Sequence, residues 1–183
     1  MNDLVQVMKA ADAAARWHVD QRRKGASQEP YLNHLLEVAS LVTEATGGRE
    51  PDLIIAALLH DAVEDVGVTK EQVAQQFGEK VAGIVMEVTD DKTLPKAERK
   101  LRQVASAGHK SREAKMIKLA DKTSNLRTIS VSPAPDWSAQ RRLDYVQWAK
   151  DVVAQVRGVS PWLEAQFDEA ATQAIGSVRD SAA

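Results

Sequence analysis

LIIAALLHDAVED, residues 53–65, contains the longest apolar run of the chain and, directly after it, a group of charged residues. Its first seven residues are apolar, which predicts a helix buried on all sides, and Pro51 suits the first turn of that helix. Four titratable residues complete the stretch: His60, Asp61, Glu64 and Asp65. Burying an ionised carboxylate is strongly unfavourable unless it is paired or binds a cation. The stretch therefore predicts a cation site at the end of a buried helix.

Helical geometry sorts these four residues into pairs. His60 and Glu64 are four residues apart and share one face of a helix that continues through residue 65, as do Asp61 and Asp65. His60 and Asp61 are adjacent, so both side chains reach one point at the end of the apolar run. We therefore expect a continuous helix from Pro51 to Asp65.

Two other segments carry residues of the same kind. Asp121 follows an apolar turn in MIKLADKTSNLR, residues 116–127, and Asn125 lies four residues on, on the same helical face. His34 begins a predicted helix in PYLNH. Two imidazoles and two carboxylates suit Mn²⁺, Fe²⁺ or Zn²⁺, with open positions for water. The candidate ligands are His34, His60, Asp61 and Asp121.

Each of these residues, taken alone, also has a purely structural explanation. His34 suits a helix cap or a core position, and Asp121 suits an ion pair with Lys118 or Lys122. The metal site is the better explanation of the group, because nothing else accounts for carboxylates at the end of so apolar a helix.

Helical spacing also dominates the rest of the chain. An apolar period of about 3.6 residues predicts an amphipathic helix over residues 3–23. The fold class predicted is all-α: one domain over residues 1–183, with roughly eight to ten helices, the last over about 160–176, and a frayed tail over 177–183. Further helices are expected from His34 to Gly47–Gly48, from Thr69 to Gly78, over 81–89, from Pro95, over 112–127, over 137–157 and from Ser160–Pro161.

Composition excludes several classes of protein. The 183 residues include no cysteine, so disulfides, thiolate zinc sites and cysteine nucleophiles are excluded, which fits a cytoplasmic protein. The longest apolar run is too short to cross a bilayer, and no signal peptide is visible, so no membrane partner is expected. A net charge of −2 and only eight aromatic residues argue against a nucleic-acid polymer as partner.

The small net charge conceals two opposed segments. Residues 50–91 carry a net charge of −8, whereas residues 92–127 carry +8. Most of these charges suit solvated helix faces. The division nevertheless allows one segment to hold a cation and the other an anion.

At these residues the sequence resembles a known family. His34, His60-Asp61 and Asp121 resemble the pattern of HD-domain metal-dependent phosphohydrolases. The resemblance narrows to the hydrolase domain of RelA/SpoT proteins, and further to the Mesh1-type small alarmone hydrolases, over about residues 8–157. It is carried, in this order, by QRRK, PYLNH, AALLHDAVED, FGEKVAGIV, EVTDDKTLPKAERK, AKMIKLADK and NLR.

The resemblance implies an activity and a set of site residues. The activity is hydrolysis of the 3′-pyrophosphate of the small-molecule nucleotide (p)ppGpp, giving GDP or GTP and pyrophosphate. The implied cofactor is one Mn²⁺ per chain, held by the four candidate ligands. Glu64 and Asp65 match the catalytic acidic pair of the family. Residues that match substrate-binding positions are Arg23, Lys24, Lys96, Asn125 and Arg141.

Three positions depart from the family pattern. Leu35 stands where the family often has proline, and Ala62 where the Mesh1-type forms often have threonine. Ser124 replaces an aromatic residue or histidine, and we expect this change to alter the wall beside the nucleotide. None of the three is an implied metal ligand.

Two other functions share most of these features. The first is an NADPH 2′-phosphatase, or another nucleotide phosphohydrolase, of the same fold. The second is a non-catalytic alarmone-binding module. The presence of Glu64 and Asp65 makes it the weaker alternative, and the same residues argue against a purely structural helical protein. Homo-oligomer formation stays open.

Overall fold

The computed structural model describes residues 3–180, and this part of the chain folds into ten helices. The prediction of an all-α fold is confirmed, since the described residues contain one isolated β-bridge, between Arg22 and Pro30, and no longer strand. The helices are α1 (Asp3–Trp17), α2 (Leu32–Thr46), α3 (Pro51–Leu59), α4 (Ala62–Val66), α5 (Lys70–Phe77), α6 (Glu79–Val88), α7 (Lys96–Ala107), α8 (Arg112–Val131), α9 (Ala139–Ala154) and α10 (Pro161–Asp180).

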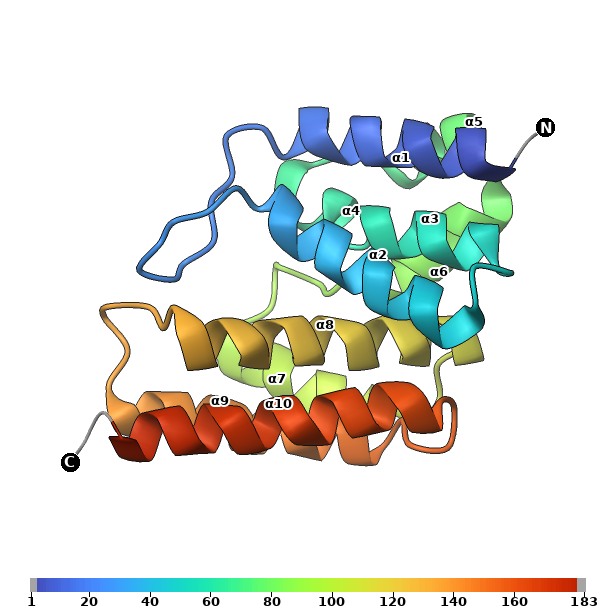
Figure 1. The fold of residues 1–183 in the computed structure, drawn as a ribbon. Helices are drawn as coiled ribbons and strands as arrows, with labels where there is room; N and C mark the ends of the chain where they lie inside the picture. Colours follow the sequence, from blue (N-terminus) through green and yellow to red (C-terminus); the bar gives the residue numbers. More distant parts are fainter. Residues whose placement is uncertain (1–2, 181–183) are drawn as a thin grey trace.

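The helices form two halves that α2 connects. In Figure 1, α1, α2 and α3 stack in one half, and α8 and α10 run side by side in the other. α2 packs on both α3 and α8, so residues of the three helices meet at the boundary. All seven residues from Leu53 to Leu59 are buried, as their unbroken apolar run predicts.

Local sequence signals set several helix ends as expected. Thr69 and Gln72 form a capping box at the start of α5, and the hydroxyl of Ser111 accepts a hydrogen bond from the backbone N–H of Ala114 at the start of α8. Gly47 ends α2 in the left-handed conformation, with φ of 60°. These ends depend on neighbouring residues, and the sequence predicts them for that reason.

Three predicted helices are shorter in the structure. The helix expected over 137–157 is α9, which spans only Ala139–Ala154. The helix expected over 3–23 ends at Trp17, because the backbone beyond it bonds to a distant segment instead: the N–H of Tyr31 donates to the carbonyl of Gln21. The continuous helix expected from Pro51 to Asp65 is wrong, because α3 ends at Leu59 and α4 begins at Ala62.

The last helix is longer than expected. α10 continues to Asp180, so residues 177–180 are helical, and the remainder of the predicted frayed tail, residues 181–183, lies outside the described residues. No helix among residues 3–180 is long and apolar enough to cross a membrane.

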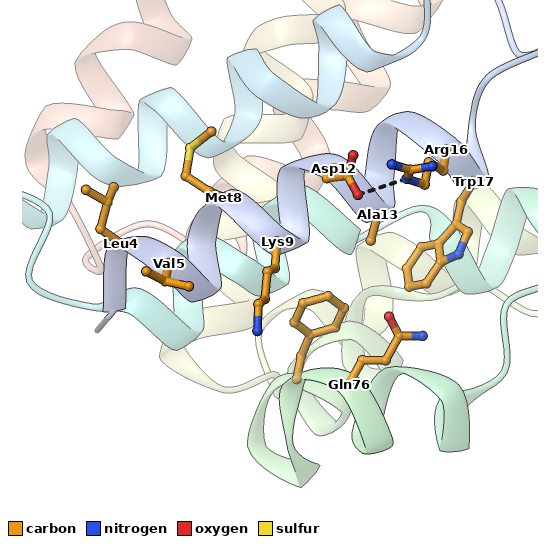
Figure 2. Close-up of a pocket in the computed structure, with 10 residues that line it drawn as sticks. Leu4, Val5, Met8, Lys9, Asp12, Ala13, Arg16, Trp17 and Gln76 are labelled. Atoms are coloured by element: carbon orange, nitrogen blue, oxygen red, sulfur yellow. Dashed lines mark hydrogen bonds and ion pairs between the residues drawn. The ribbon is translucent and has the colours of Figure 1, made fainter. Parts of the chain in front are cut away.

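An open, mostly apolar groove of about 800 Å³ lies between α1 and α5. Figure 2 shows Leu4, Val5 and Met8 along one side, and an ion pair of 2.8 Å between Arg16 and Asp12. The groove shares no lining residue with the cavities beside His60 and contains no histidine. The metal chemistry predicted from the sequence therefore belongs elsewhere.

Candidate active site

Three helices bring two histidines and two aspartates together. His34 comes from α2, His60 and Asp61 from the break between α3 and α4, and Asp121 from α8. Donor atoms of His34, His60 and Asp121 all lie within 4.8 Å of one another. Oδ2 of Asp61 lies 3.1 Å from Nε2 of His60 and 3.7 Å from Nε2 of His34. The four residues that the sequence nominates as ligands therefore share one buried cluster.

Both imidazoles are oriented to offer Nε2 as a ligand atom. Nδ1 of His60 lies 2.8 Å from the carbonyl oxygen of Ala57, which only accepts, so this nitrogen carries the proton. Nδ1 of His34 bonds to the hydroxyl of Ser124 at 2.8 Å. The two Nε2 atoms are buried and find no aligned hydrogen-bond partner anywhere in residues 3–180. Two such nitrogens beside carboxylates fit a divalent metal ion.

The break between α3 and α4 shapes this cluster. In an uninterrupted helix the N–H of Asp61 would donate to the carbonyl of Ala57, which instead receives Nδ1–H of His60. The hydroxyl of Tyr31 donates to Oδ2 of Asp61 over 2.7 Å and pulls that side chain toward α2. A turn therefore directs His60 and Asp61 inward where a continuous helix was expected, and Glu64 still lines the same cavity as His60.

The carboxylates and basic groups of the cluster shift one another's pKa values. Burial alone lowers the pKa of His60, but the Asp61 and Asp121 carboxylates outweigh burial and raise it to about 9. Burial also opposes the charge on Asp121, yet Lys122, 2.9 Å away, together with His34 and His60, lowers its pKa well below the ordinary value. The cluster attracts positive charge strongly, as a cation site does.

Glu64 and Asp65 are both held by other residues near the cluster. The backbone N–H of Asp90 donates to Glu64 over 3.0 Å, and burial raises the pKa of Glu64. Asp65 accepts a hydrogen bond of 2.7 Å from the side-chain amide of Gln21 and pairs with Lys92 at 2.5 Å. Both carboxylates are thus oriented by contacts from distant parts of the chain.

Two cavities meet at this acidic pair. An inner cavity of about 190 Å³ is lined by His60, Asp61 and Asp121, and an outer pocket of about 490 Å³ opens beside it. Glu64 and Asp65 line both cavities. The acidic pair therefore lies between the His/Asp cluster and any molecule bound in the outer pocket.

The outer pocket is basic. All five residues expected to bind substrate line it, and they are Arg23, Lys24, Lys96, Asn125 and Arg141. Burial and the neighbouring charges of Arg141 and Lys24 lower the pKa of Lys96, which indicates cations crowded without enough anions to balance them. Arg23 is 6% exposed and donates to the hydroxyl of Thr128, which fixes its guanidinium against α8. The geometry suits a ligand with several negative charges.

The pocket also contains aromatic residues that the sequence did not single out. Trp137, Tyr145 and Trp148 line it, and the ammonium of Lys100 lies 4.7 Å from the centre of the Trp148 ring. Tyr145 and Trp148 are three residues apart in α9, a spacing that puts them on one face. This three-residue spacing could have predicted an aromatic pocket wall from the sequence. The low aromatic content of the whole chain instead directs attention away from these residues.

One expectation about the pocket wall is wrong. Ser124 is fully buried and bonds to His34, so it lies behind the His/Asp cluster and does not line the outer pocket. The reason is its position on α8: Ser124 faces α2, whereas the following residue, Asn125, lines the pocket.

Comparison with known proteins agrees with this arrangement. Residues 10–146 match the family model of the HD domain. The chain is 46% identical over 167 residues to guanosine-3′,5′-bis(diphosphate) 3′-pyrophosphohydrolase MESH1 of Xenopus tropicalis, which covers 91% of this chain and 93% of that protein. It is 45% identical to the MESH1 of Homo sapiens, over 89% of this chain and 91% of the human protein.

A solved structure shares the fold. It is described as a metazoan ortholog of SpoT that hydrolyses ppGpp and plays a role in starvation responses. The two structures align with a TM-score of 0.88 and 42% identity, over 92% of this chain and 94% of the other. The chain therefore belongs to the HD-domain family and, within it, to the group of MESH1 proteins.

Proposed function

We propose that this protein hydrolyses the 3′-pyrophosphate of (p)ppGpp, releasing GDP or GTP and pyrophosphate. The MESH1 relatives carry this activity in their names and align with the chain over about nine tenths of both lengths. The observation that carries the proposal is the position of Glu64 and Asp65, which line both the inner cavity of the His/Asp cluster and the basic outer pocket.

The proposed ligands of the metal are His34, His60, Asp61 and Asp121, and the proposed ion is Mn²⁺. A divalent cation bound by them supplies Lewis acidity that makes water a nucleophile near neutral pH. The support is the pair of unpartnered Nε2 atoms among the described residues and the concentration of carboxylates around them.

The acidic pair carries the proton transfers in this proposal. Glu64 orients the attacking water and accepts its proton, because its carboxylate is already held by the N–H of Asp90. Water attacks the phosphorus joined to the 3′-oxygen, the bond between them breaks, and the electron pair leaves on that oxygen. The 3′-oxygen takes a proton from a solvent water held by Asp65, which lines the outer pocket, and the proton on Glu64 returns to solvent.

The basic pocket binds the substrate. Lys24, Lys96 and Arg141 neutralise phosphate charge that grows in the transition state. Trp137 and Trp148 line the same pocket beneath basic side chains: Arg141 lies over the Trp137 ring at 4.6 Å and Lys100 over the Trp148 ring at 4.7 Å. Such a pocket binds a multiply charged mononucleotide, and its size of about 490 Å³ suits a small molecule better than a polymer.

The test compares two substrates under one condition. Protein stripped with a chelator is supplied with Mn²⁺ and assayed in parallel for pyrophosphate release from ppGpp and phosphate release from NADPH. The proposal expects ppGpp to be the better substrate by kcat/KM. A preference for NADPH would assign the site to the 2′-phosphatase alternative, and ppGpp bound intact by Mn²⁺-loaded protein would assign it to a binding module.

A further inference from the structure

A chain of four polar side chains extends from His34 to the last helix. Nδ1 of His34 lies 2.8 Å from Oγ of Ser124, whose hydroxyl donates to Oε2 of Glu37 over 2.6 Å. Oε1 of Glu37 accepts from Nη1 of Arg127 at 3.0 Å, and Nη2 of Arg127 donates to Oε1 of Gln166 at 2.7 Å. This series of hydrogen bonds, which we call the His34 relay, links residues of α2 and α8 and ends at Gln166 on α10.

The direction of each hydrogen bond in this chain follows from its acceptors. A carboxylate such as that of Glu37 only accepts, and a serine hydroxyl has one hydrogen to donate. Because the hydroxyl of Ser124 gives that hydrogen to Glu37, it must accept from Nδ1–H of His34. The proton of the neutral imidazole is thereby fixed on Nδ1, and the lone pair of Nε2 faces the cluster.

We propose that Ser124 and Glu37 are positioning residues that fix the tautomer and orientation of His34 for metal binding. Arg127 holds the Glu37 carboxylate in place through its hydrogen bond to Oε1. The inference rests on the metal site of the proposed function, and it assigns a role to Ser124, which departs from the family pattern. Gln166 also lies beyond residue 146, where the HD-domain match ends, so α10 contributes to the support of the site.

The burial of this chain separates it from an ordinary surface network. Ser124 is fully buried and His34 is 2% exposed, so water does not replace a lost hydrogen bond there. Glu37 is the accessible end, with a side chain that is 33% exposed. Substitution at Glu37 therefore alters the hydrogen bonding while leaving the packing around His34 intact.

The first experiment measures Mn²⁺ affinity by electron paramagnetic resonance of the free ion. The variants are Ser124→Ala and Glu37→Gln. Thr123→Val is the matched control, because it removes a buried hydroxyl of the same helix that donates to the carbonyl of Leu119 instead of to Glu37. Loss of an outer partner of a metal-bound histidine typically weakens metal binding about 10–100-fold, and we expect this loss in both variants and not in the control. Wild-type affinity in both folded variants would overturn the proposal, and Glu37→Gln decides alone if Ser124→Ala does not fold.

The second experiment reads the tautomer directly in metal-free protein. The chain has four histidines, so the ¹⁵N signals of the His34 ring can be assigned by single substitutions. We expect the Nδ1–H tautomer in the wild type. In Glu37→Gln the new amide can donate to Ser124, whose hydroxyl then turns to His34, and the Nε2–H tautomer should appear. An identical His34 tautomer in both proteins would overturn the proposal that Glu37, acting through Ser124, fixes the proton on Nδ1.

The two readouts separate this inference from the proposed function. Absence of Mn²⁺ binding by the wild type would contradict the metal site, whereas the nitrogen signals test the relay without any metal. Unchanged Mn²⁺ affinity and an unchanged His34 tautomer in the variants would contradict the role of Ser124 and Glu37 and would leave the metal site itself untouched.

Discussion

The backbone N–H of Asp90 donates a hydrogen bond to Oε2 of Glu64 over 3.0 Å, across 26 positions of sequence. Asp90 is itself held, because its carboxylate accepts from the side-chain amide of Gln103 and lies 3.9 Å from Nζ of Lys118. Arg99 lies 3.7 Å from the other oxygen of Glu64. The carboxylate is therefore oriented before any substrate enters, which is the condition for an efficient proton acceptor.

Replacing Glu64 by glutamine removes the proton acceptor and keeps the shape of the side chain. We expect kcat for ppGpp hydrolysis to fall by about 10²–10⁴-fold, the usual contribution of general acid–base catalysis. Mn²⁺ binding should persist, since Glu64 is not among the proposed ligands. Glu71→Gln, an exposed substitution on α5, is the control. Turnover at the wild-type rate would remove Glu64 from the mechanism.

The pH dependence of the reaction should also report on Glu64. Burial raises its pKa above the ordinary value of 4.5, and a proton acceptor works only when ionised. As the pH falls through this raised pKa, Glu64 gains a proton, so kcat/KM should decline at a pH above 4.5. Bound Mn²⁺ must be measured at each pH to exclude metal loss. A constant kcat/KM down to pH 4.5 in fully loaded protein would argue against this role.

Asp121 should be needed for the metal itself. Asp121→Ala is expected to lose bound Mn²⁺ and activity together, measured by metal analysis after gel filtration and by pyrophosphate release. Because the substitution leaves the buried Lys122 without its partner, Asp121→Asn is the second variant if the first does not fold. Asp12→Ala, in the groove between α1 and α5, is the control. Full Mn²⁺ occupancy in folded Asp121→Asn would exclude Asp121 as a required ligand.

Gly25 should matter for substrate binding. A Cβ atom at this position would lie 2.3 Å from the carbonyl oxygen of Ser132, so Gly25→Ala must displace either the segment at Ser132 or the loop that carries Arg23 and Lys24, and we expect the loop to move. Overpacking of this kind costs about 1–3 kcal/mol, and we expect KM for ppGpp to rise by about tenfold, with a smaller change in kcat. Gly176→Ala, where nothing lies within 4 Å, is the matched control. An unchanged KM would show that the loop adjusts without moving its basic residues.

Sequence reasoning succeeded where a feature depends on neighbouring residues. The capping box of Thr69 and Gln72, the cap at Ser111 and the buried run from Leu53 to Leu59 all depend on local pattern, and all are found. The break at His60 was missed because an apolar run followed by helix-compatible residues does not show that a side chain will compete for the carbonyl of Ala57.

The residues that orient the site side chains could not be predicted from local sequence pattern. Tyr31 reaches Asp61 across 30 positions, and Gln21 reaches Asp65 across 44. Such pairs form only when helices pack, and no periodicity in the chain encodes them. The position of Ser124 behind His34 is of the same kind, because a sequence does not show which face of α8 turns toward α2.

Metal-dependent hydrolysis by the His/Asp cluster is tested most simply by assaying pyrophosphate release from ppGpp by metal-stripped protein, with and without added Mn²⁺. We predict GDP and pyrophosphate in equal amounts, formed only when the metal is present and absent in Asp121→Asn. Equal rates with and without metal, or intact ppGpp bound by Mn²⁺-loaded protein, would show that this site does not catalyse metal-dependent hydrolysis of ppGpp.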